Sequence, residues 1–228
     1  MKTGIYIGIL SIILLSQDCT GQKVIRPGAE RLEMYLPLLE GKRIGIVANQ
    51  TSMIRETHLV DSLIAIEGEV IRIRKVFSPE HGFRGEAEYG ELVEDKADPR
   101  TGLPVVSLYG RNRKPSPEDL EDIDLVLFDI QDVGVRFYTY ISTLFYIMQA
   151  CAENDRELLL LDRPNPNGYY VDGPVLEPEF SSFTGMHEVP VVYGMTIGEY
   201  GNMINGEGWL GDGLTCRLTV IPCLNYDH

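Results

Sequence analysis

The sequence predicts an α/β fold: a doubly wound, mostly parallel sheet with helices on both of its faces. Short apolar runs alternate along the chain with segments of helical periodicity, as expected for strands joined by helical crossovers. The apolar runs are continuous instead of alternating with polar residues, which is typical of strands buried on both faces of a parallel sheet. No internal repeat and no low-complexity tract in the sequence favours a different architecture.

The predicted strands are six apolar runs. The first is followed by Asn49, the second ends at Ser78 and Pro79, and the third is closed by Gly110. Each of these residues favours a turn, so the runs have the short length of strands. The predicted strands are residues 43–48, 70–77, 104–109, 124–130, 157–161 and 217–221.

Helices are predicted in four of the intervening segments. Ser116 is suited to cap a short helix, because Pro117 follows at the first helical position and acidic residues fill the first turn. Thr196 and Glu199 have the spacing of a capping box at the start of another helix. The predicted helices are residues 58–66, a short helix after Ser116, residues 140–154 and residues 196–205.

The first 22 residues are predicted to be an export signal. Lys2 supplies a positive charge, residues 5–15 are almost wholly apolar, and residues 16–22 are polar. The apolar run is shorter than a membrane-spanning helix and has about the length of a signal-peptide core. The alternative is a buried N-terminal strand or helix. Cys19 is placed like a lipid-anchored cysteine, but the residues before it match a lipidation site poorly. We expect an exported, periplasmic protein, with an outer-membrane lipoprotein as the alternative.

Composition excludes several classes of function. The formal net charge of −14 argues against a nucleic-acid-binding protein, which needs a basic surface, and against docking on anionic membranes. His58, His81 and His187 lack the spacing of metal ligands, and the cysteines form no CxxC pair. A GxGxxG pattern occurs once, in residues 206–211, but it follows a predicted helix instead of a strand. We therefore predict no metal and no cofactor.

Polar side chains follow five of the predicted strands. In doubly wound sheets the binding crevice lies beyond the carboxyl ends of the strands, so these side chains are expected to meet there. The sequence thus predicts a site at this edge of the sheet. The residues at these strand ends that we single out are Asn49, Glu80, His81, Tyr109, Asp129, Gln131, Asp132, Arg163, Asn165 and Asn167.

Five ordered motifs stand out along the chain, in residues 78–85, 129–140, 161–168, 172–174 and 193–199. They resemble those of the NamZ-like exo-β-N-acetylmuramidases, and the resemblance covers the chain from about residue 24 to its end. Family members have a Rossmann-like domain followed by a smaller C-terminal domain, so this chain resembles a fragment truncated at its C-terminus. We expect a signal peptide in residues 1–22, a Rossmann-like catalytic domain in 23–190, and in 191–228 the start of the second domain or the final elements.

The resemblance implies release of N-acetylmuramic acid from the non-reducing end of peptidoglycan fragments such as muropeptides. Glycosidases need a proton donor and a second group at the anomeric centre. Glu80 is the expected general acid, because nearby Phe77 and Phe83 could raise its pKa by desolvation; an exposed turn glutamate is the alternative. The second group is Asp129 or Asp132, or the acetamido oxygen of the substrate with an aspartate orienting it. Each aspartate is equally suited to cap the following helix.

Other residues are candidates for binding the sugar. Arg84, Arg136 and Arg163 could pair with the lactyl carboxylate of muramic acid, with surface ion pairs as the alternative. His81 could orient Glu80 or contact sugar, or be held by turn backbone.

Aromatic and amide side chains complete the predicted site. Tyr109, Tyr138 and Tyr140 could form a sugar platform, although Tyr140 could instead face the core. Asn165 and Asn167 could bind hydroxyl groups or hold an Asx turn. Two other readings of the whole site stay open: a non-hydrolytic amino-sugar-binding module, and a hydrolase of another amino-sugar glycoside.

Overall fold

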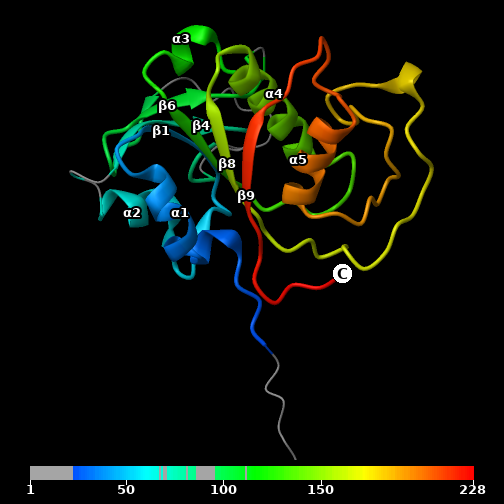
Figure 1. The fold of residues 1–228 in the computed structure, drawn as a ribbon, viewed down its shortest axis with the longest axis horizontal. Coiled ribbons are helices and arrows are strands. Elements are labelled where there is room, and N and C mark those ends of the chain that lie inside the picture. Colours follow the sequence, from blue (N-terminus) through cyan, green and yellow to red (C-terminus); the bar gives the residue numbers. More distant parts are fainter. Residues whose placement is uncertain (1–22, 67, 69–70, 81, 86–95, 111) are drawn as a thin grey trace, which may run out of the picture.

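The strands form one sheet in the order β5-β6-β4-β1-β7-β8-β9 (Figure 1). The structure is a computed structural model that describes residues 23–66, 68, 71–80, 82–85, 96–110 and 112–228. All neighbouring pairs in the sheet are parallel except β5 with β6, which is antiparallel at one edge. The predicted doubly wound, mostly parallel α/β sheet is confirmed.

The central strands are buried over almost their whole length, because helices cover both faces of the sheet. A separate two-stranded hairpin, β2 with β3, follows β1. The strands are β1 Arg43–Ala48, β2 Met53–Ile54, β3 Thr57–His58, β4 Arg72–Ser78, β5 Lys96–Ala97, β6 Pro104–Ser107, β7 Leu125–Asp129, β8 Glu157–Leu161 and β9 Arg217–Ile221.

Helices α1 and α2 cover one face of the sheet, and α4 and α5 cover the other (Figure 1). The two predicted capping boxes are present: Ser116 with Asp119 at α3, and Thr196 with Glu199 at α5. Short 3-10 helices lie at Gly28–Glu30 and Pro178–Phe180. The α-helices are α1 Leu32–Leu39, α2 Leu59–Ile64, α3 Pro117–Leu120, α4 Tyr140–Glu153 and α5 Ile197–Gly206.

Two hydrophobic cores lie on the two faces of the sheet. Successive residues of β7 alternate between them: Val126 and Phe128 belong to the core under α4 and α5, whereas Leu125 and Leu127 belong to the core under α1 and α2. This alternation follows from the two-residue period of a strand.

The order of the strands reverses direction at β1. The chain runs outward from β1 to β4 and β6, then returns to β7 on the other side of β1 and continues to β8 and β9. The crevice of such a sheet lies beyond the carboxyl ends of the strands at this switch point. Asn49 follows β1, Glu80 follows β4, and the segment from Asp129 to Asp132 follows β7.

The segment before α1 pairs with the segment after β9. Arg26 and Leu224 form an antiparallel bridge, and the N–H of Gly28 donates to the carbonyl of Asp162 at 2.7 Å. Gly28 has no room for a side chain, because a Cβ atom there would lie 2.4 Å from the carbonyl oxygen of Ile221. Both ends of the described chain are thus fastened to the same end of the sheet.

The predicted export signal, including Cys19, lies outside the described residues. Among the helices that the structure describes, none is long and apolar enough to cross a membrane. Residues 191–228 supply α5 and β9, and β9 pairs in parallel with β8 of the same sheet.

Candidate active site

Side chains from three neighbouring strand ends meet around Tyr140, the first residue of α4. Burial raises the pKa of Tyr140 to about 12; nearby Tyr138 adds to the rise, the amide of Asn49 opposes it, and the carboxyl groups of Glu80 and Asp132 add to it. The ring of Tyr138 meets that of Tyr140 edge-on, with their centroids 5.2 Å apart. We call these five residues the carboxyl-edge cluster.

Asp132 holds one carboxylate oxygen in fixed hydrogen bonds and leaves the other free. The N–H of Gly134 donates to Oδ2 at 2.8 Å, and the hydroxyl of Tyr193 donates to the same atom. Oδ1 has no hydrogen-bond partner among the described residues, although Asp132 is only 3% exposed. Burial raises the pKa of the Asp132 carboxyl group, while the hydrogen bonds from the Tyr193 hydroxyl and from the backbone N–H groups of Gly134 and Val133 act in the opposite direction.

Asn49 shows the same division between a fixed atom and a free one. Its Oδ1 accepts from the N–H of Thr51 at 2.8 Å and from the Thr51 hydroxyl at 2.6 Å. Its backbone carbonyl accepts from Nε2 of His58 at 2.9 Å. Its Nδ2 meets no partner with full hydrogen-bond geometry in the described part of the chain, although the Asn49 side chain lies near enough to the Tyr140 hydroxyl to lower the pKa of Tyr140 as a hydrogen-bond donor, and Asn49 is fully buried. Native proteins leave few buried polar atoms unpaired, so two in one cluster indicate a functional site.

Asp129 differs from Asp132 because Arg163 occupies both of its oxygens. The Nε and Nη2 atoms of Arg163 donate to Oδ1 and Oδ2 of Asp129 at 2.6 and 2.8 Å, and Nη2 also donates to the carbonyl of Met53 at 3.0 Å. Asp129 is 0% exposed and Arg163 is 7% exposed. Burial lowers the pKa of Arg163, but Asp129 outweighs this effect and keeps it above the ordinary value. The structure therefore joins these two predicted site residues to each other, beneath the strand ends.

Arg84 also lies in an ion-pair network inside the chain. Its guanidinium group donates to both oxygens of Asp98, at 2.8 and 2.7 Å, and to both oxygens of Asp61, at 3.2 and 3.0 Å. The hydrogen bonds from Arg84 lower the pKa of Asp98 to about 2. This network fastens the turn that follows Glu80 to α2 and to the segment after β5. His81, which we also predicted in this turn, lies outside the described residues.

The third predicted arginine binds backbone. Nη1 of Arg136 donates to the carbonyl of Pro174, at 3.0 Å, and to the carbonyl of Val189. All three arginines thus have partners within the chain, and recognition of a lactyl carboxylate by any of them stays a prediction.

The predicted amide residues hold the loops together. Gln131 donates from Nε2 to the carbonyls of Asp132 and Pro164, at 2.6 and 2.8 Å. Asn165 accepts from the N–H of Asn167 at 2.8 Å, which is the Asx turn that we considered as the alternative.

Two further tyrosines lie near the strand ends. Tyr109 follows β6, and its N–H donates to the Ser107 hydroxyl at 3.3 Å. Tyr193 is the contact that our prediction of site residues missed, although it lies in one of the five motifs that we singled out.

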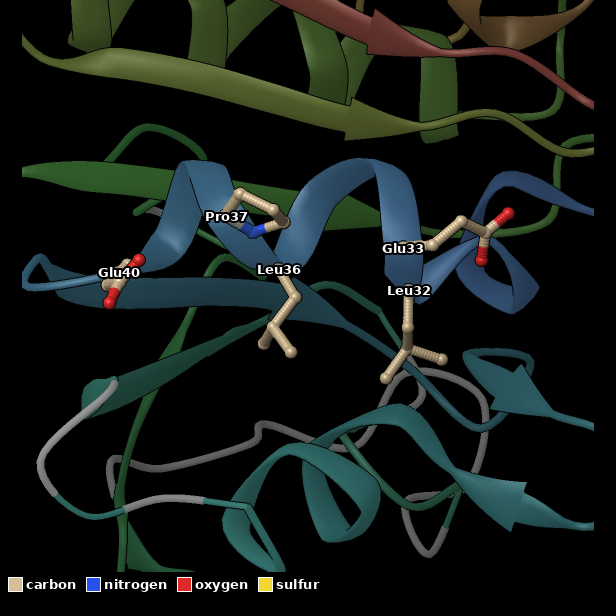
Figure 2. Close-up of a pocket in the computed structure, with 5 residues that line it drawn as sticks. All are labelled: Leu32, Glu33, Leu36, Pro37 and Glu40. Atoms are coloured by element: carbon tan, nitrogen blue, oxygen red, sulfur yellow. The ribbon is translucent and has the colours of Figure 1, made fainter.

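A shallow groove of about 270 Å³ lies beside α1, and its lining residues belong to that helix and its C-cap (Figure 2). Leu32 and Leu36 point from α1 toward α2 (Figure 2). None of the predicted site residues lines this groove. Among the residues that the structure describes, no group of three His, Cys, Asp or Glu side chains is placed to hold a metal ion.

Comparison with known families shows which family the chain belongs to. The family model "Exo-beta-N-acetylmuramidase NamZ, N-terminal" matches residues 44–228. The chain belongs to this NamZ family. The match includes the strands β1 through β9 except Arg43, the first residue of β1, so the carboxyl-edge cluster lies inside the NamZ N-terminal region.

Relatives of known name or structure agree with the NamZ assignment. The chain is 43% identical over 207 residues to the peptidoglycan beta-N-acetylmuramidase NamZ of Bacillus subtilis (strain 168), covering 88% of this chain and 50% of that protein. Two crystal structures of DUF1343 family proteins from Bacteroides fragilis NCTC 9343 superpose with TM-scores of 0.81 and 0.80, at 45% and 40% identity. They cover 90% and 89% of this chain and 54% and 51% of their own. This NamZ chain thus spans about half the length of these relatives.

Proposed function

We propose that the protein carrying this chain hydrolyses peptidoglycan fragments and releases N-acetylmuramic acid from their non-reducing ends. The single observation that carries the proposal is the 43% identity, over 88% of this chain, to the Bacillus subtilis peptidoglycan beta-N-acetylmuramidase. The carboxyl-edge cluster supports it, because the carboxyl groups of Glu80 and Asp132 both lie near enough to Tyr140 to raise its pKa, and glycoside hydrolysis uses two such groups. The proposal concerns the whole protein, since the chain covers half of that relative.

Glu80 is the proposed general acid. It follows β4 on a half-buried turn that Arg84 fastens to Asp98 and Asp61, so its position is held from outside the cluster. A carboxylic acid there would give its proton to the oxygen of the departing sugar.

Asp132 is the proposed second carboxyl group, in preference to Asp129. Both oxygens of Asp129 are bound by Arg163, whereas Oδ1 of Asp132 makes no hydrogen bond to any described residue. An oxygen without an internal partner is available to substrate.

Export to the periplasm is part of the proposal. The predicted signal in residues 1–22 would bring the protein to its substrate, which lies outside the cytoplasmic membrane. Muropeptides and disaccharides containing N-acetylmuramic acid are the proposed substrates.

The test is Glu80→Gln in the whole protein, which keeps the size of the side chain but removes its transferable proton. Hydrolysis of a disaccharide with N-acetylmuramic acid at its non-reducing end should fall by about 10² to 10⁴, the usual contribution of general acid catalysis. A nitrophenyl glycoside should lose less, because its leaving group needs little protonation. Liquid chromatography of the released sugar measures both rates.

Glu121→Gln is the matched control, because Glu121 is an exposed residue at the end of α3. It should leave both rates unchanged. Near wild-type hydrolysis of the disaccharide by Glu80→Gln would overturn the assignment of Glu80. Binding of the disaccharide without hydrolysis by the wild-type protein would instead show a sugar-binding module.

A further inference from the structure

We infer that Asn49 and Asp132 together form the subsite for the 2-acetamido group of the sugar. Nδ2 of Asn49 donates to the acetyl carbonyl, and Oδ1 of Asp132 accepts from the amide N–H. The inference rests on the proposed function, because it names which feature of the amino sugar that site selects. The two atoms are the unpaired buried ones described above, on loops that follow neighbouring strands.

The identity of each free atom is fixed by its bonded neighbour. Thr51 presents two donors to one end of the Asn49 amide, so that end is the oxygen and the free end is the NH₂ group. Tyr193 and Gly134 both donate to Oδ2 of Asp132, which leaves Oδ1 as an acceptor. The cluster therefore holds one free donor and one free acceptor in fixed positions.

A secondary amide matches this arrangement better than the other substituents found at the same carbon of a sugar. Its carbonyl accepts and its N–H donates, from two separate atoms. A free ammonium group only donates, so it would satisfy Asp132 and leave Nδ2 of Asn49 facing another donor. A single buried group left without its partner weakens binding by roughly tenfold or more.

The aromatic members of the cluster suit the methyl end of the acetamido group. Tyr140 is 5% exposed and lies close to both Asn49 and Asp132, and Tyr138 is 42% exposed beside it. Both free atoms are shielded from water, and Tyr138 is the most exposed member of the cluster. Aromatic rings supply the apolar surface that a methyl group favours.

The test measures binding of free N-acetylmuramic acid and of muramic acid, which lacks the acetyl group, to the whole protein by calorimetry. The quantity of interest is the ratio of the two dissociation constants. In Asp132→Asn, the donors from Tyr193 and Gly134 keep the remaining oxygen, so an NH₂ group replaces the free acceptor. In Asn49→Asp, Thr51 keeps one oxygen, so a second oxygen replaces the free donor. Asn49→Asp should reduce the preference for the N-acetyl sugar about tenfold or more, because only that sugar offers a carbonyl to the lost donor. Asp132→Asn removes an acceptor that both sugars use, so it should weaken the binding of both about tenfold or more.

Asp162→Asn is the matched control, because Asp162 is a buried carboxylate at the next strand end with both oxygens bonded. Its Oδ1 accepts from the N–H groups of Arg163 and Gly198, and its Oδ2 accepts from the Thr196 hydroxyl. This variant should keep the wild-type ratio. Thermal unfolding of each variant shows whether it folds.

A change in the ligand keeps the inference testable if a variant does not fold. The 2-O-acetyl analogue of the sugar has the carbonyl but lacks the N–H. The wild-type protein should bind it about tenfold or more weakly than the N-acetyl sugar. Asp132→Asn should not weaken its binding further, whereas Asn49→Asp should.

Equal loss of affinity for all three sugars in either variant, or an unchanged ratio in Asn49→Asp, would overturn the inference. Water would then satisfy the two atoms. These outcomes do not depend on turnover, so they separate the subsite from the proposed function. If the wild-type protein prefers the N-acetyl sugar but cleaves no glycoside, the subsite is supported and the proposed hydrolase activity is refuted. If the protein cleaves the disaccharide normally but Asn49→Asp leaves the ratio of the two dissociation constants unchanged, the activity is supported and the subsite is refuted.

Discussion

At the scale of the residue, two aspartates on one strand-to-helix connection have different roles. The sequence predicts that both Asp129 and Asp132 lie at the carboxyl end of the strand, and it treats them as equivalent. Only the structure separates them, because the partner of Asp129 is Arg163 in the loop after β8, and the partner of Asp132 is Tyr193 in a later loop. Both contacts are between residues distant in sequence, so no local spacing reveals them.

The buried ion pair should make Asp129→Asn strongly destabilising. The substitution leaves the charge of Arg163 buried without a counter-charge, and breaking a buried pair in this way costs about 3–5 kcal/mol. Urea unfolding gives the loss directly.

An exposed pair provides the comparison for Asp129→Asn. Asp155→Asn breaks the pair with Arg217, whose side chains are 89% and 56% exposed, and should cost less than about 1 kcal/mol. Equal losses for the two variants would contradict the argument from burial.

At the scale of the element, patterns local in sequence were sufficient for most of the fold. Runs of continuous apolar residues located the six parallel strands, and cap residues located the starts of α3 and α5. Helix α1 was not predicted, although Tyr35 and Leu39 are buried at helical spacing, because Pro37 interrupts it. The edge strand β5 and the hairpin strands β2 and β3 have only two residues each, too few for a periodic signal.

The arginines show why the site was harder to predict than the fold. A cluster of Arg84, Arg136 and Arg163 near the strand ends resembles an anion-binding set in sequence. Their acceptors come from α2, the segment after β5, β7 and the long loops, which only the folded chain brings near.

The 3-10 helix Gly28–Glu30 packs closely against the backbone at the end of the sheet, so a larger residue at Gly28 should destabilise the protein. Gly28→Ala places a methyl group 2.4 Å from the Ile221 carbonyl and 2.7 Å from the backbone nitrogen of Asp162. Backbone cannot yield like a flexible side chain, so overpacking should cost about 1–3 kcal/mol or more. The midpoint of urea unfolding should fall accordingly.

Gly206→Ala is the control for Gly28→Ala, because a Cβ atom at this helical position meets nothing within 4 Å. It should be neutral, or stabilise the protein by up to about 1 kcal/mol through helix propensity. If Gly28→Ala were as well tolerated as Gly206→Ala, the close packing of the N-terminal segment would be refuted.

At the scale of the whole molecule, two buried groups make opposite contributions to the pH dependence of stability. Burial lowers the pKa of His187 to about 4, so stability falls as the pH drops from 6.5 toward 4, where only the unfolded chain takes up the proton. Burial raises the pKa of Asp162 to about 6, so stability rises as the pH drops from 6 toward 3.8, where the folded chain takes up the proton first. Between pH 6 and pH 4 the loss of stability from His187 and the gain from Asp162 therefore largely cancel.

Replacing His187 should reveal the pH dependence of stability that Asp162 contributes. His187→Phe keeps an aromatic ring against Trp209 but cannot be protonated, so relative to wild type it should gain on the order of 3 kcal/mol between pH 7 and pH 4. Urea midpoints at the two pH values measure this.

Tyr200→Phe removes the same hydrogen bond to His187, of 3.0 Å, without removing the histidine. It should change stability by a similar amount at both pH values. If His187→Phe also changed stability by the same amount at both pH values, His187 would not be the cause of the loss of stability between pH 7 and pH 4.

The bridge between Arg26 and Leu224 joins segments that are made at opposite ends of this chain, so it can form only late in synthesis. The strand at the middle of the sheet, β1, gains its second neighbour only with β7, and the segment before α1 finds its partner only after β9 has left the ribosome. Contacts between residues this distant in sequence form slowly. Until β9 has been made, the segment before α1 therefore has no partner, and the sheet cannot reach its final arrangement.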